Sequence, residues 1–197
     1  MTFRMRAHLL SMSPLVLLAG FLCCSLTAVQ SQLQTNFKQM ADGKRWTKNN
    51  LDINVSQSYC YEDDKANCAR YGRLYTWQSA QQACQLLGNG WRLPTDEEWR
   101  LLAKQYGGVS IDADDKGRTA FKALLTGGNS GFSALLGGGR SSDGQYARLE
   151  AHGFYWTVSA IDSGNAWYYN FGKGGQALHR QDGGDKNSAF SVRCVRD

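Results

Sequence analysis

Residues 76–87 carry apolar side chains every three or four positions, which is the spacing of one face of a helix. Gly88 follows directly and is a typical helix stop. The pattern therefore predicts a helix over residues 76–87 whose apolar face turns Cys84 toward the core. That face consists of Trp77, Ala80, Cys84 and Leu87.

A second helix is predicted over residues 96–106, and its start carries the strongest local signal in the chain. Thr95 is followed three residues later by Glu98, which is the spacing of a capping box. Asp96 and Glu97 between them suit the positive end of the helix dipole. The apolar stripe of this helix consists of Trp99, Leu102, Ala103 and Tyr106.

From residue 107 onward glycine is frequent and the expected elements become shorter. The pattern F-x-A-L-L-x-G-G occurs at residues 121–128 and again at residues 132–139, but two copies do not make a repeat architecture. We interpret them as a helical turn and then a strand or loop that share a composition by chance.

The last third of the chain predicts strands, because aromatic and β-branched residues are separated there by Gly, Asp, Asn and Ser. In the final strand Phe190, Val192 and Cys194 share one face, since side chains alternate between the faces of a strand. Cys194 is therefore expected on the buried face. The residues that alternate with this set are Ser191, Arg193 and Val195. The expected strands are residues 154–159, 166–171, 177–180 and 189–196.

The two periodicities converge on a disulfide, because the helical pattern buries Cys84 and the strand pattern buries Cys194. This bridge would close a loop of about 110 residues and contribute roughly 4 to 5 kcal/mol in the chain-entropy model. Cys60 and Cys68 would then close a small acidic loop.

The first 31 residues have the pattern of a secretory signal peptide. Arg4 and Arg6 form a basic start, residues 15–24 are an apolar run, and a small and polar stretch follows. The run is about half the length needed to cross a bilayer, so a transmembrane helix is not expected. Cleavage after Ala28 or after Ser31 fits equally well.

Cys23 and Cys24 follow the apolar run, which is where bacterial lipoproteins carry their lipid. Leu22 occupies a position where a small residue is expected, so free secretion is favoured and a lipid anchor stays an alternative. Removal of the signal peptide leaves four cysteines, and an even count in an exported chain predicts two disulfides.

Charge and metal-ligand spacing exclude two function classes. The chain has 22 Lys and Arg residues, of which 20 follow the signal peptide, against 17 acidic residues, so the mature charge is +3. The basic residues are scattered among acidic ones, and nucleic-acid binding is not expected. No cysteine pair has C-x-x-C spacing, and His152 and His179 are the only mature histidines, so a zinc site is not expected either.

Several short motifs occur in a fixed order along residues 44–197. They are Tyr59-Cys60-Tyr61, Asn67-Cys68, YGRLYTW at residues 71–77, GWRLPTDEEW at residues 90–99, Gly131-Phe132, FYWT at residues 154–157 and FSVRCV at residues 190–195. In order and spacing they resemble the Fibrobacter succinogenes major paralogous domain. That family is related to the formylglycine-generating sulfatase-modifying enzymes, which share its fold.

The resemblance implies an α+β fold of the C-type-lectin-like, or formylglycine-generating-enzyme-like, kind. Two helices, short twisted antiparallel strands and glycine-rich loops are expected. The resemblance also implies a bacterial envelope or secreted domain, often carried on lipoproteins. We therefore expect a signal peptide at residues 1–31, a flexible leader at residues 32–43 and a single domain at residues 44–197.

Catalysis is not expected from the mature chain. An enzyme like the formylglycine generator needs a reactive cysteine pair in an open cleft, whereas all four mature cysteines serve better as structural bridges. Ser130 lies outside any G-x-S-x-G motif and has no evident histidine partner, so a hydrolase has little support.

Calcium-dependent sugar binding lacks its usual motifs. An E-P-N or Q-P-D triplet is absent, because Pro94 is the only proline of the mature chain. Asp112, Asp114 and Asp115 offer hard oxygen ligands for a structural calcium ion, yet such a cluster is more often a solvated loop. We therefore expect no metal site and keep calcium at these three residues as the alternative.

The best candidate for a ligand surface lies on residues 167–171 and 180–186. Alternation must leave some of the aromatic residues outside the core, and aromatic side chains beside charged ones suit stacking on sugars or anchoring a protein. The alternative interpretation is two strands and a polar turn, in which the charged residues only fix the loop. The candidate residues are Trp167, Tyr168, Tyr169, Arg180, Asp182 and Asp185.

The export signal and the missing catalytic groups together predict a non-catalytic binding module whose ligand is an unknown glycan or protein. Three alternatives stay open: an envelope structural protein, a variable receptor diversified by a retroelement, and an enzyme of unrecognised chemistry. The sequence leaves the identity of the ligand and the oligomeric state open.

Overall fold

The structure is a computed structural model that describes residues 36–197. The expected signal peptide, Cys23, Cys24 and residues 32–35 of the expected leader lie outside the described residues. The described part combines helices and strands, in agreement with the α+β class expected from the sequence. Its helices are the 3-10 helix η1 (Tyr61–Asp63), α2 (Lys65–Tyr71), α3 (Trp77–Gln85), α4 (Asp96–Lys104) and α5 (Arg118–Leu124).

The strands of residues 36–197 form three sheets. They are β1 (Phe37–Gln39), β2 (Arg45–Thr47), β3 (Ser58–Tyr59), β4 (Leu74–Tyr75), β5 (Gly137–Arg140), β6 (Tyr146–Leu149), β7 (His152–Ala160), β8 (Asn165–Gly172), β9 (Ala177–Asp185) and β10 (Val195–Arg196). The largest sheet has the order β6-β5-β7-β8-β9, in which β5 and β7 run parallel and the other neighbours antiparallel. A three-stranded sheet β1-β2-β10 joins the start of the domain to its end, and β3 pairs with β4.

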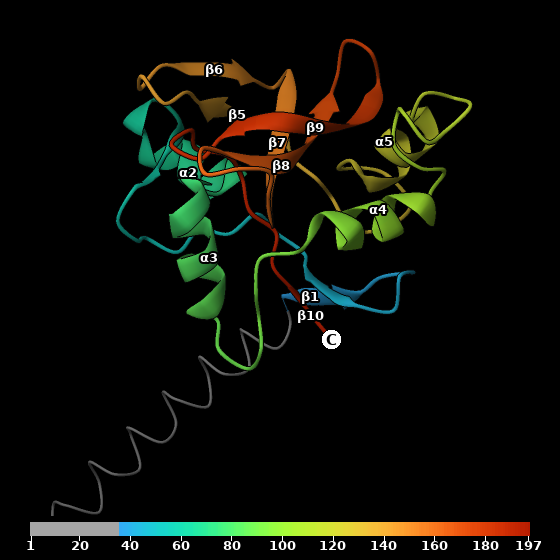
Figure 1. The fold of residues 1–197 in the computed structure, drawn as a ribbon, viewed down its shortest axis with the longest axis horizontal. Coiled ribbons are helices and arrows are strands. Elements are labelled where there is room, and N and C mark those ends of the chain that lie inside the picture. Colours follow the sequence, from blue (N-terminus) through green and yellow to red (C-terminus); the bar gives the residue numbers. More distant parts are fainter. Residues whose placement is uncertain (1–35) are drawn as a thin grey trace, which may run out of the picture. The chain divides into compact units, whose positions relative to one another are not determined.

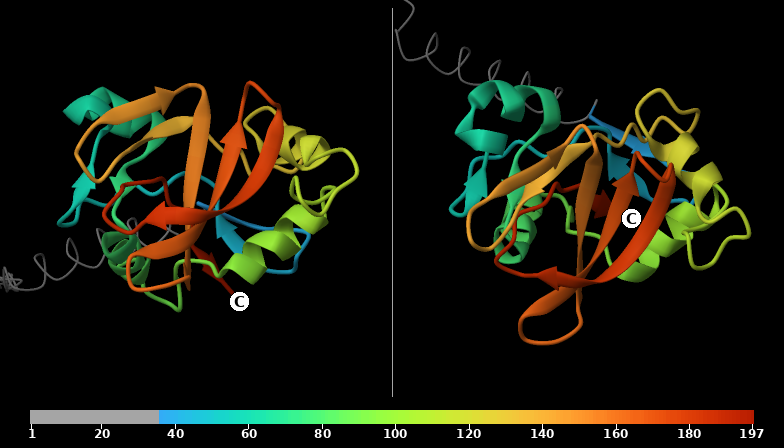
Figure 2. Two further views of the ribbon diagram at one scale, coloured as in Figure 1. Left: turned by 45° about the horizontal axis from the view of Figure 1, so that its top comes forward. Right: turned by 90° about the horizontal axis from the view of Figure 1, so that it is seen from above.

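Helices flank the five-stranded sheet on two sides (Figures 1 and 2). Seen from above, α2 and α3 lie to one side of the sheet and α4 and α5 to the other. The three-stranded sheet lies below it in the orientation of Figure 1. The domain therefore leaves part of the five-stranded sheet without a covering helix.

Both predicted helices are present, as α3 and α4. The capping box is formed: the Glu98 N–H donates to Thr95 Oγ1 at 3.1 Å, and the Thr95 N–H donates to Glu98 Oε2 at 2.9 Å. α4 therefore starts at Asp96 as expected, while its C-terminal end lies two residues before the predicted one.

Residues 36–197 contain two α-helices, α2 and α5, besides the two that the sequence predicted. α2 begins after Asp64, whose carboxylate accepts from the Ala66 N–H at 2.9 Å, and it ends at Gly72, which has a φ of 78°. α5 extends the helical turn expected at residues 121–128 to an earlier start at Arg118. Both helices span only seven residues, which is too short for a clear helical period in the sequence.

The flexible leader expected at residues 32–43 is contradicted over its second part. Phe37–Gln39 forms β1 and pairs antiparallel with β2. The Phe37 ring lies 5.8 Å from the Trp91 ring, and Met40 is buried at 4% exposure. The domain therefore begins before residue 44, because pairing with β2 and apolar contacts hold this segment in place.

The strand expected at residues 189–196 is contradicted over most of its length, because only Val195–Arg196 forms a strand, β10. The segment before β10 is hydrogen-bonded to other segments on both sides. The Tyr75 N–H of β4 donates to the Phe190 carbonyl, and the Ser191 N–H donates to the Phe154 carbonyl of β7. Both sets of alternating side chains therefore contain buried members. Fully buried residues of the segment are Ser191, Val192, Arg193, Cys194 and Val195.

Trp99 of α4 lies in the centre of the main core and is fully buried. Its ring stacks on Tyr169 of β8 with a centroid distance of 5.0 Å and an interplanar angle of 17°. Edge contacts join it to Trp46 at 5.1 Å and to Phe132 at 5.5 Å. Buried aromatic pairs of this kind add about 0.5–1.5 kcal/mol each beyond the burial of their area.

Two disulfides tie the domain together. Cys84 of α3 is joined to Cys194 near the C terminus across 110 residues, and Cys60 is joined to Cys68 of α2 across eight residues. These are the two pairings that the sequence indicated. They are typical of a protein that matures outside the cytoplasm. Across residues 36–197, every helix is too short or too polar to cross a membrane.

Candidate functional site

Tyr169 is not available to a ligand, contrary to the expectation from the sequence. Its ring is fully buried against Trp99, and its hydroxyl donates to the Asp96 carbonyl at 3.0 Å and lies 3.1 Å from Asp96 Oδ1. Burial raises the pKa of the Tyr169 phenol far above its usual value. Tyr169 therefore belongs to the core and fixes β8 to the start of α4.

Arg180 and Trp167 contact one another. The guanidinium carbon of Arg180 lies 3.4 Å from the centroid of the Trp167 ring. Arg180 Nε and Nη2 donate to the two carboxylate oxygens of Asp96 at 2.8 and 2.7 Å, and this bond raises the pKa of Arg180. The pair with Asp96 is mostly buried, so Arg180 has a structural role: it joins β9 to the start of α4, and not only the loop that the sequence indicated.

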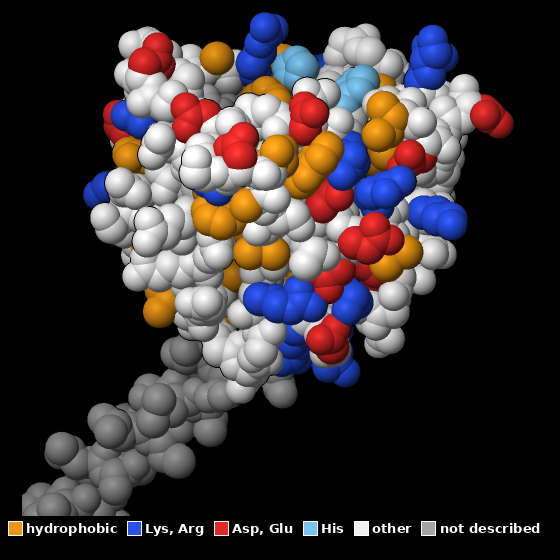
Figure 3. Space-filling model, in the orientation of Figure 1, with side chains coloured by type: hydrophobic (Ala, Val, Ile, Leu, Met, Phe, Trp, Pro, Cys, Tyr) orange, Lys and Arg blue, Asp and Glu red, His pale blue; other side chains and the backbone are white. Residues whose placement is uncertain are grey.

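The neighbourhood of α4 holds further ion pairs, and Figure 3 shows acidic and basic side chains interleaved over α4 and near the C terminus. Arg100 Nη2 lies 3.0 Å from Asp112 Oδ2. Glu98 accepts two bonds of 2.7 Å from Arg92. Burial by itself raises the pKa of Glu98, but the bonds from Arg92 and the Thr95 N–H outweigh it and lower the pKa to about 2.

Two of the three aspartates considered for calcium have other partners. Asp112 pairs with Arg100, and the Asp115 carboxylate accepts from the backbone N–H groups of Gly117 at 2.9 Å and Thr119 at 2.7 Å. Among the residues that the structure describes, no group of three or more His, Cys, Asp and Glu side chains is placed to hold a metal ion. The acidic loop therefore serves to start α5.

Asp185 also has a structural contact. Its carboxylate accepts from the Asn187 N–H at 2.8 Å, and this bond, followed by one with the Ser142 side chain, lowers the pKa of Asp185. Asp182 is exposed and lies close enough to Tyr168 that its charge adds to burial in raising the pKa of the Tyr168 phenol. Of the candidate residues, Asp182 is thus exposed, and Trp167 and Tyr168 are half-buried.

Tyr168 belongs to a cluster of half-buried rings on the side of the sheet opposite Tyr169. The centroid distances are 5.0 Å between Tyr168 and Phe190, 5.1 Å between Phe154 and Phe190, and 6.1 Å between Phe154 and Tyr168. We call Phe154, Tyr168 and Phe190 the aromatic face. Sequence analysis identified only Tyr168 of this set, because the other two rings come from distant segments.

Two glycines make room for these rings. A Cβ atom on Gly184 would lie 2.8 Å from Tyr168 Cδ1, and a Cβ atom on Gly139 would lie 3.0 Å from Phe154 Cδ2. Both distances are closer than ordinary contacts allow. The rings therefore lie directly against the backbone of β9 and β5.

A hollow of about 440 Å³ lies beside the start of α3. Four segments form it: the residue before β3, the start of α3, the turn between β7 and β8, and the turn after β9. Sequence analysis missed this site, since no local pattern joins these segments. We call it the Trp77 pocket, and it is lined by Gln57, Thr76, Trp77, Gln78, Gln81, Ser163, Lys186 and Asn187.

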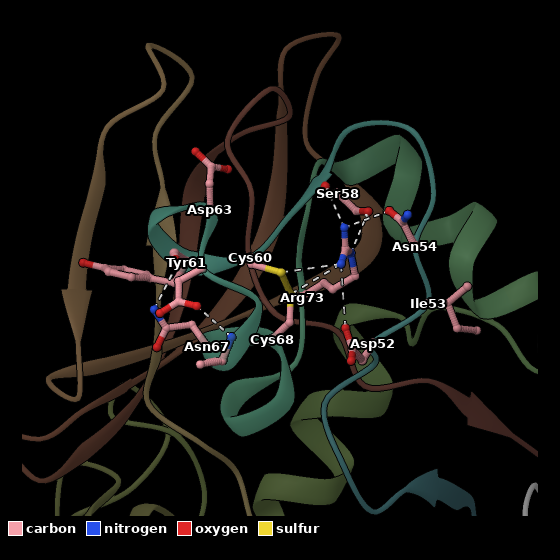
Figure 4. Close-up of a disulfide and its surroundings, with 12 residues drawn as sticks. Asp52, Ile53, Asn54, Ser58, Cys60, Tyr61, Asp63, Asn67, Cys68 and Arg73 are labelled. Carbon is pink, nitrogen blue, oxygen red and sulfur yellow. Dashed lines mark hydrogen bonds and ion pairs between the residues drawn. A yellow bond between two sulfur atoms is a disulfide. The ribbon is translucent and has the colours of Figure 1, made fainter.

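The four described cysteines offer no free thiol, because both pairs are disulfides and all four are buried. Figure 4 shows Arg73 pointing at the first bridge, with Nη1 3.5 Å from Cys60 Sγ and 3.4 Å from Cys68 Sγ. Arg73 Nε also donates to Ser58 Oγ at 3.0 Å, and Nη2 donates to Asn54 Oδ1 at 2.7 Å. The guanidinium thus joins the disulfide to the loop before β3.

Comparison with known protein families gives one match that spans most of the chain. The model of the Fibrobacter succinogenes major domain (Fib_succ_major) matches residues 30–196. A search of curated proteins found no match to the chain. The matched segment includes β1, which agrees with the place of residues 37–39 in the folded domain.

Proposed function

Since the chain belongs to the Fibrobacter succinogenes major domain family, we propose that it is a non-catalytic binding module of the bacterial cell envelope or the secreted fraction. Two disulfides support maturation in an oxidising compartment. The bridge between α3 and the C-terminal segment, next to curled sheets, supports a C-type-lectin-like scaffold for this module. The ligand is a glycan or a protein.

The observation that carries the proposal is the aromatic face. Rings of Phe, Tyr and Trp are the side chains most often used to anchor sugars and protein partners. The three rings are half-buried, and Tyr168 and Phe190 pack on the core at their inner edges, so their outer edges can contact a ligand. Polar side chains adjoin the rings: Gln181 pairs with Tyr168 in the sheet, and Asn170 pairs with Phe154. Apolar rings bordered by amides suit a ligand with both kinds of surface.

Binding is favoured over catalysis because the carboxylates at the start of α4 are already held in ion pairs. Asp96 is held by Arg180, and Glu98 is held by Arg92 and Lys44. A general acid or base needs a carboxyl or imidazole free to exchange its proton with a substrate. The paired carboxylates instead support a structural role for this side of the domain.

The test is a comparison of ligand capture by three forms of the chain, exported and purified with both disulfides. Each is applied to a glycan array and to envelope extracts, and bound material is quantified. Tyr168→Ser removes one ring of the aromatic face, and Leu86→Ser is the matched control, because Leu86 is 59% exposed at the end of α3. Thermal unfolding of each form shows that it is folded.

We expect a common ligand for the original chain and Leu86→Ser, and at least tenfold weaker capture by Tyr168→Ser. Empty arrays and empty extracts would contradict the binding function. Equal capture by Tyr168→Ser and the original chain would contradict the role of the aromatic face. A purely structural protein of the envelope predicts the first of these two results.

A further inference from the structure

We infer that the Trp77 pocket binds a carboxylate-bearing sugar unit of an acidic saccharide. The inference rests on the proposed binding function and adds to it a second site with a stated ligand class. Three properties of the pocket support it: a prebuilt shape, a single cation without a carboxylate partner, and walls of neutral hydrogen-bonding groups around an indole.

The pocket is held in shape by backbone bonds between three of its four segments. The Trp77 N–H donates to the Lys186 carbonyl at 3.1 Å, and the Lys186 N–H donates to the Gly164 carbonyl at 2.9 Å. Trp77 Nε1 donates to the Thr157 carbonyl at 2.8 Å, which fixes the indole. A volume of about 440 Å³ falls within the roughly 300–1,000 Å³ of small-ligand sites.

Lys186 is the one charged side chain among the eight that line the pocket. Its Nζ lies 4.5 Å from the centroid of the Trp77 ring and donates to the carbonyls of Asp162 at 2.5 Å and Ser163 at 3.3 Å. Within residues 36–197 it forms no ion pair with a carboxylate. The Asp162 carboxylate instead accepts from the N–H groups of Gly164 and Asn165. Bonds from Asn165 and Gly164 lower the pKa of Asp162, and the nearby charge of Lys186 lowers it further. Because no ion pair within this part of the chain holds the ammonium group, an anionic ligand can still contact it.

The remaining polar groups of the wall are neutral. Gln81 Nε2 donates to the Trp77 carbonyl at 3.2 Å, which leaves its Oε1 as an acceptor. Each amide presents a donor and an acceptor side by side, and this pair matches two neighbouring hydroxyl groups of a sugar. The indole offers an apolar surface to the ring carbons. The amide and hydroxyl side chains are Gln57, Gln78, Gln81, Asn187, Thr76 and Ser163.

This composition favours a monoanionic sugar over other small anions. Phosphate and sulfate esters are usually held by arginine forks or by several cations, whereas the pocket supplies one lysine. A neutral sugar would leave the ammonium group without an ion-pair partner. The lining contains no carboxylate, imidazole or thiol, so the bound sugar meets no general base and is held without being cleaved.

The experiment is calorimetric titration of the purified chain with oligosaccharides of galacturonic, glucuronic and mannuronic acid. The methyl ester of each oligosaccharide is the uncharged ligand of the same shape. Lys186→Gln removes the charge of the pocket, and Lys173→Gln is the matched control, because Lys173 is exposed in the turn between β8 and β9. Trp77→Phe reports whether a ligand-induced change in fluorescence comes from the pocket.

We expect at least one of the three acids to bind, with at least tenfold weaker affinity for its methyl ester and for Lys186→Gln. Lys173→Gln should bind as the original chain does, and Trp77→Phe should lose the fluorescence change. Absence of binding by all three acids overturns the inference, and so does equal affinity for the ester or for Lys186→Gln. Neither result contradicts the role of the aromatic face, because that role is tested separately with Tyr168→Ser and another ligand.

Discussion

Arg193 Nε donates to Asn50 Oδ1 at 2.8 Å in the interior of the domain, where both side chains are buried. The rest of the guanidinium is surrounded by backbone carbonyls, at distances of 2.6 to 2.9 Å. Burial lowers the pKa of Arg193 to about 10, so the side chain is charged at neutral pH. These oxygen atoms replace the lost water and join three separate segments. The carbonyls belong to Thr47, Lys48, Phe132 and Ser133.

Replacement of Arg193 by Lys keeps the charge and removes the fork of donors. An ammonium group has three N–H donors, so at least two of the buried acceptors would lose their partner, at about 1–3 kcal/mol each. We expect Arg193→Lys to lower the free energy of unfolding by roughly 2–5 kcal/mol. Urea unfolding at pH 7 measures this, with the exposed Arg118→Lys as the control. Equal stability of the two variants would show that the carbonyl contacts contribute little.

Glu98 makes the domain sensitive to acid. Its pKa in the folded state is about 2, below the usual value of 4.5, so its contribution is fully present above about pH 4.5 and is lost as the pH falls toward 2. This difference corresponds to roughly 2–3 kcal/mol. We expect Glu98→Gln to be less stable than the original chain by about this amount at pH 7 and equally stable near pH 2.

The control for Glu98 is its neighbour Glu97, which has 68% side-chain exposure and only a contact of 4.0 Å with Arg100. Glu97→Gln should follow the pH dependence of the original chain within about 0.5 kcal/mol. Urea unfolding at several pH values between 2 and 7 measures both variants. A constant difference between Glu98→Gln and the original chain over this range would contradict the ion-pair explanation.

The two disulfides differ in the length of chain that they close. In the chain-entropy model, removal of Cys84–Cys194 costs roughly 4 to 5 kcal/mol, and removal of Cys60–Cys68 roughly 2 to 3 kcal/mol. We therefore expect the double alanine variant of the first pair to unfold at a clearly lower urea concentration than that of the second. Peptide mapping without reduction verifies the remaining bridge in each variant. Equal losses would show that native contacts, and not chain entropy, determine the effect.

Local signals explain which parts of the fold the sequence predicts well. Thr95 and Glu98 bond to one another across one turn, so the start of α4 depends on few distant contacts. Cys84 and Cys194 were paired because each lies on a face that its own segment defines. The start of α4 and the Cys84–Cys194 bridge thus follow from short-range patterns, whereas the Cys60–Cys68 pairing follows by elimination and the α+β class is implied by the family resemblance.

The prediction of buried residues fails where burial depends on segments that are distant in the sequence. Strand alternation assumes that one face meets solvent, but residues 189–192 are paired on both sides, so Arg193 and Ser191 are buried as well. Alternation also predicts that Tyr168 and Tyr169 face opposite ways, but only the position of Trp99 decides which one is inside. The Trp77 pocket joins four separate segments of the chain, and no local pattern marks it.

The position of the Tyr168 ring depends on Gly184, which itself has no side chain that could contact a ligand. A Cβ atom on Gly184 would lie 2.6 Å from Trp156 Cζ3 and 2.8 Å from Tyr168 Cδ1, so Gly184→Ala must displace both rings. Overpacking of this kind typically costs about 1–3 kcal/mol. We expect Gly184→Ala to lose stability by this amount and to lose the ligand that Tyr168→Ser loses.

Gly183 is the matched control, because a Cβ atom there would meet nothing within 4 Å. Gly183→Ala should keep the stability of the original chain within about 0.5–1 kcal/mol and bind the ligand normally. Thermal unfolding and capture of the array ligand are measured on both variants, at a temperature where each is fully folded. If Gly184→Ala is destabilised yet binds as well as Gly183→Ala, the position of the Tyr168 ring does not matter for recognition, and the contact surface must lie elsewhere. If binding falls with the ring displaced, the backbone of β9 is part of what positions the aromatic face.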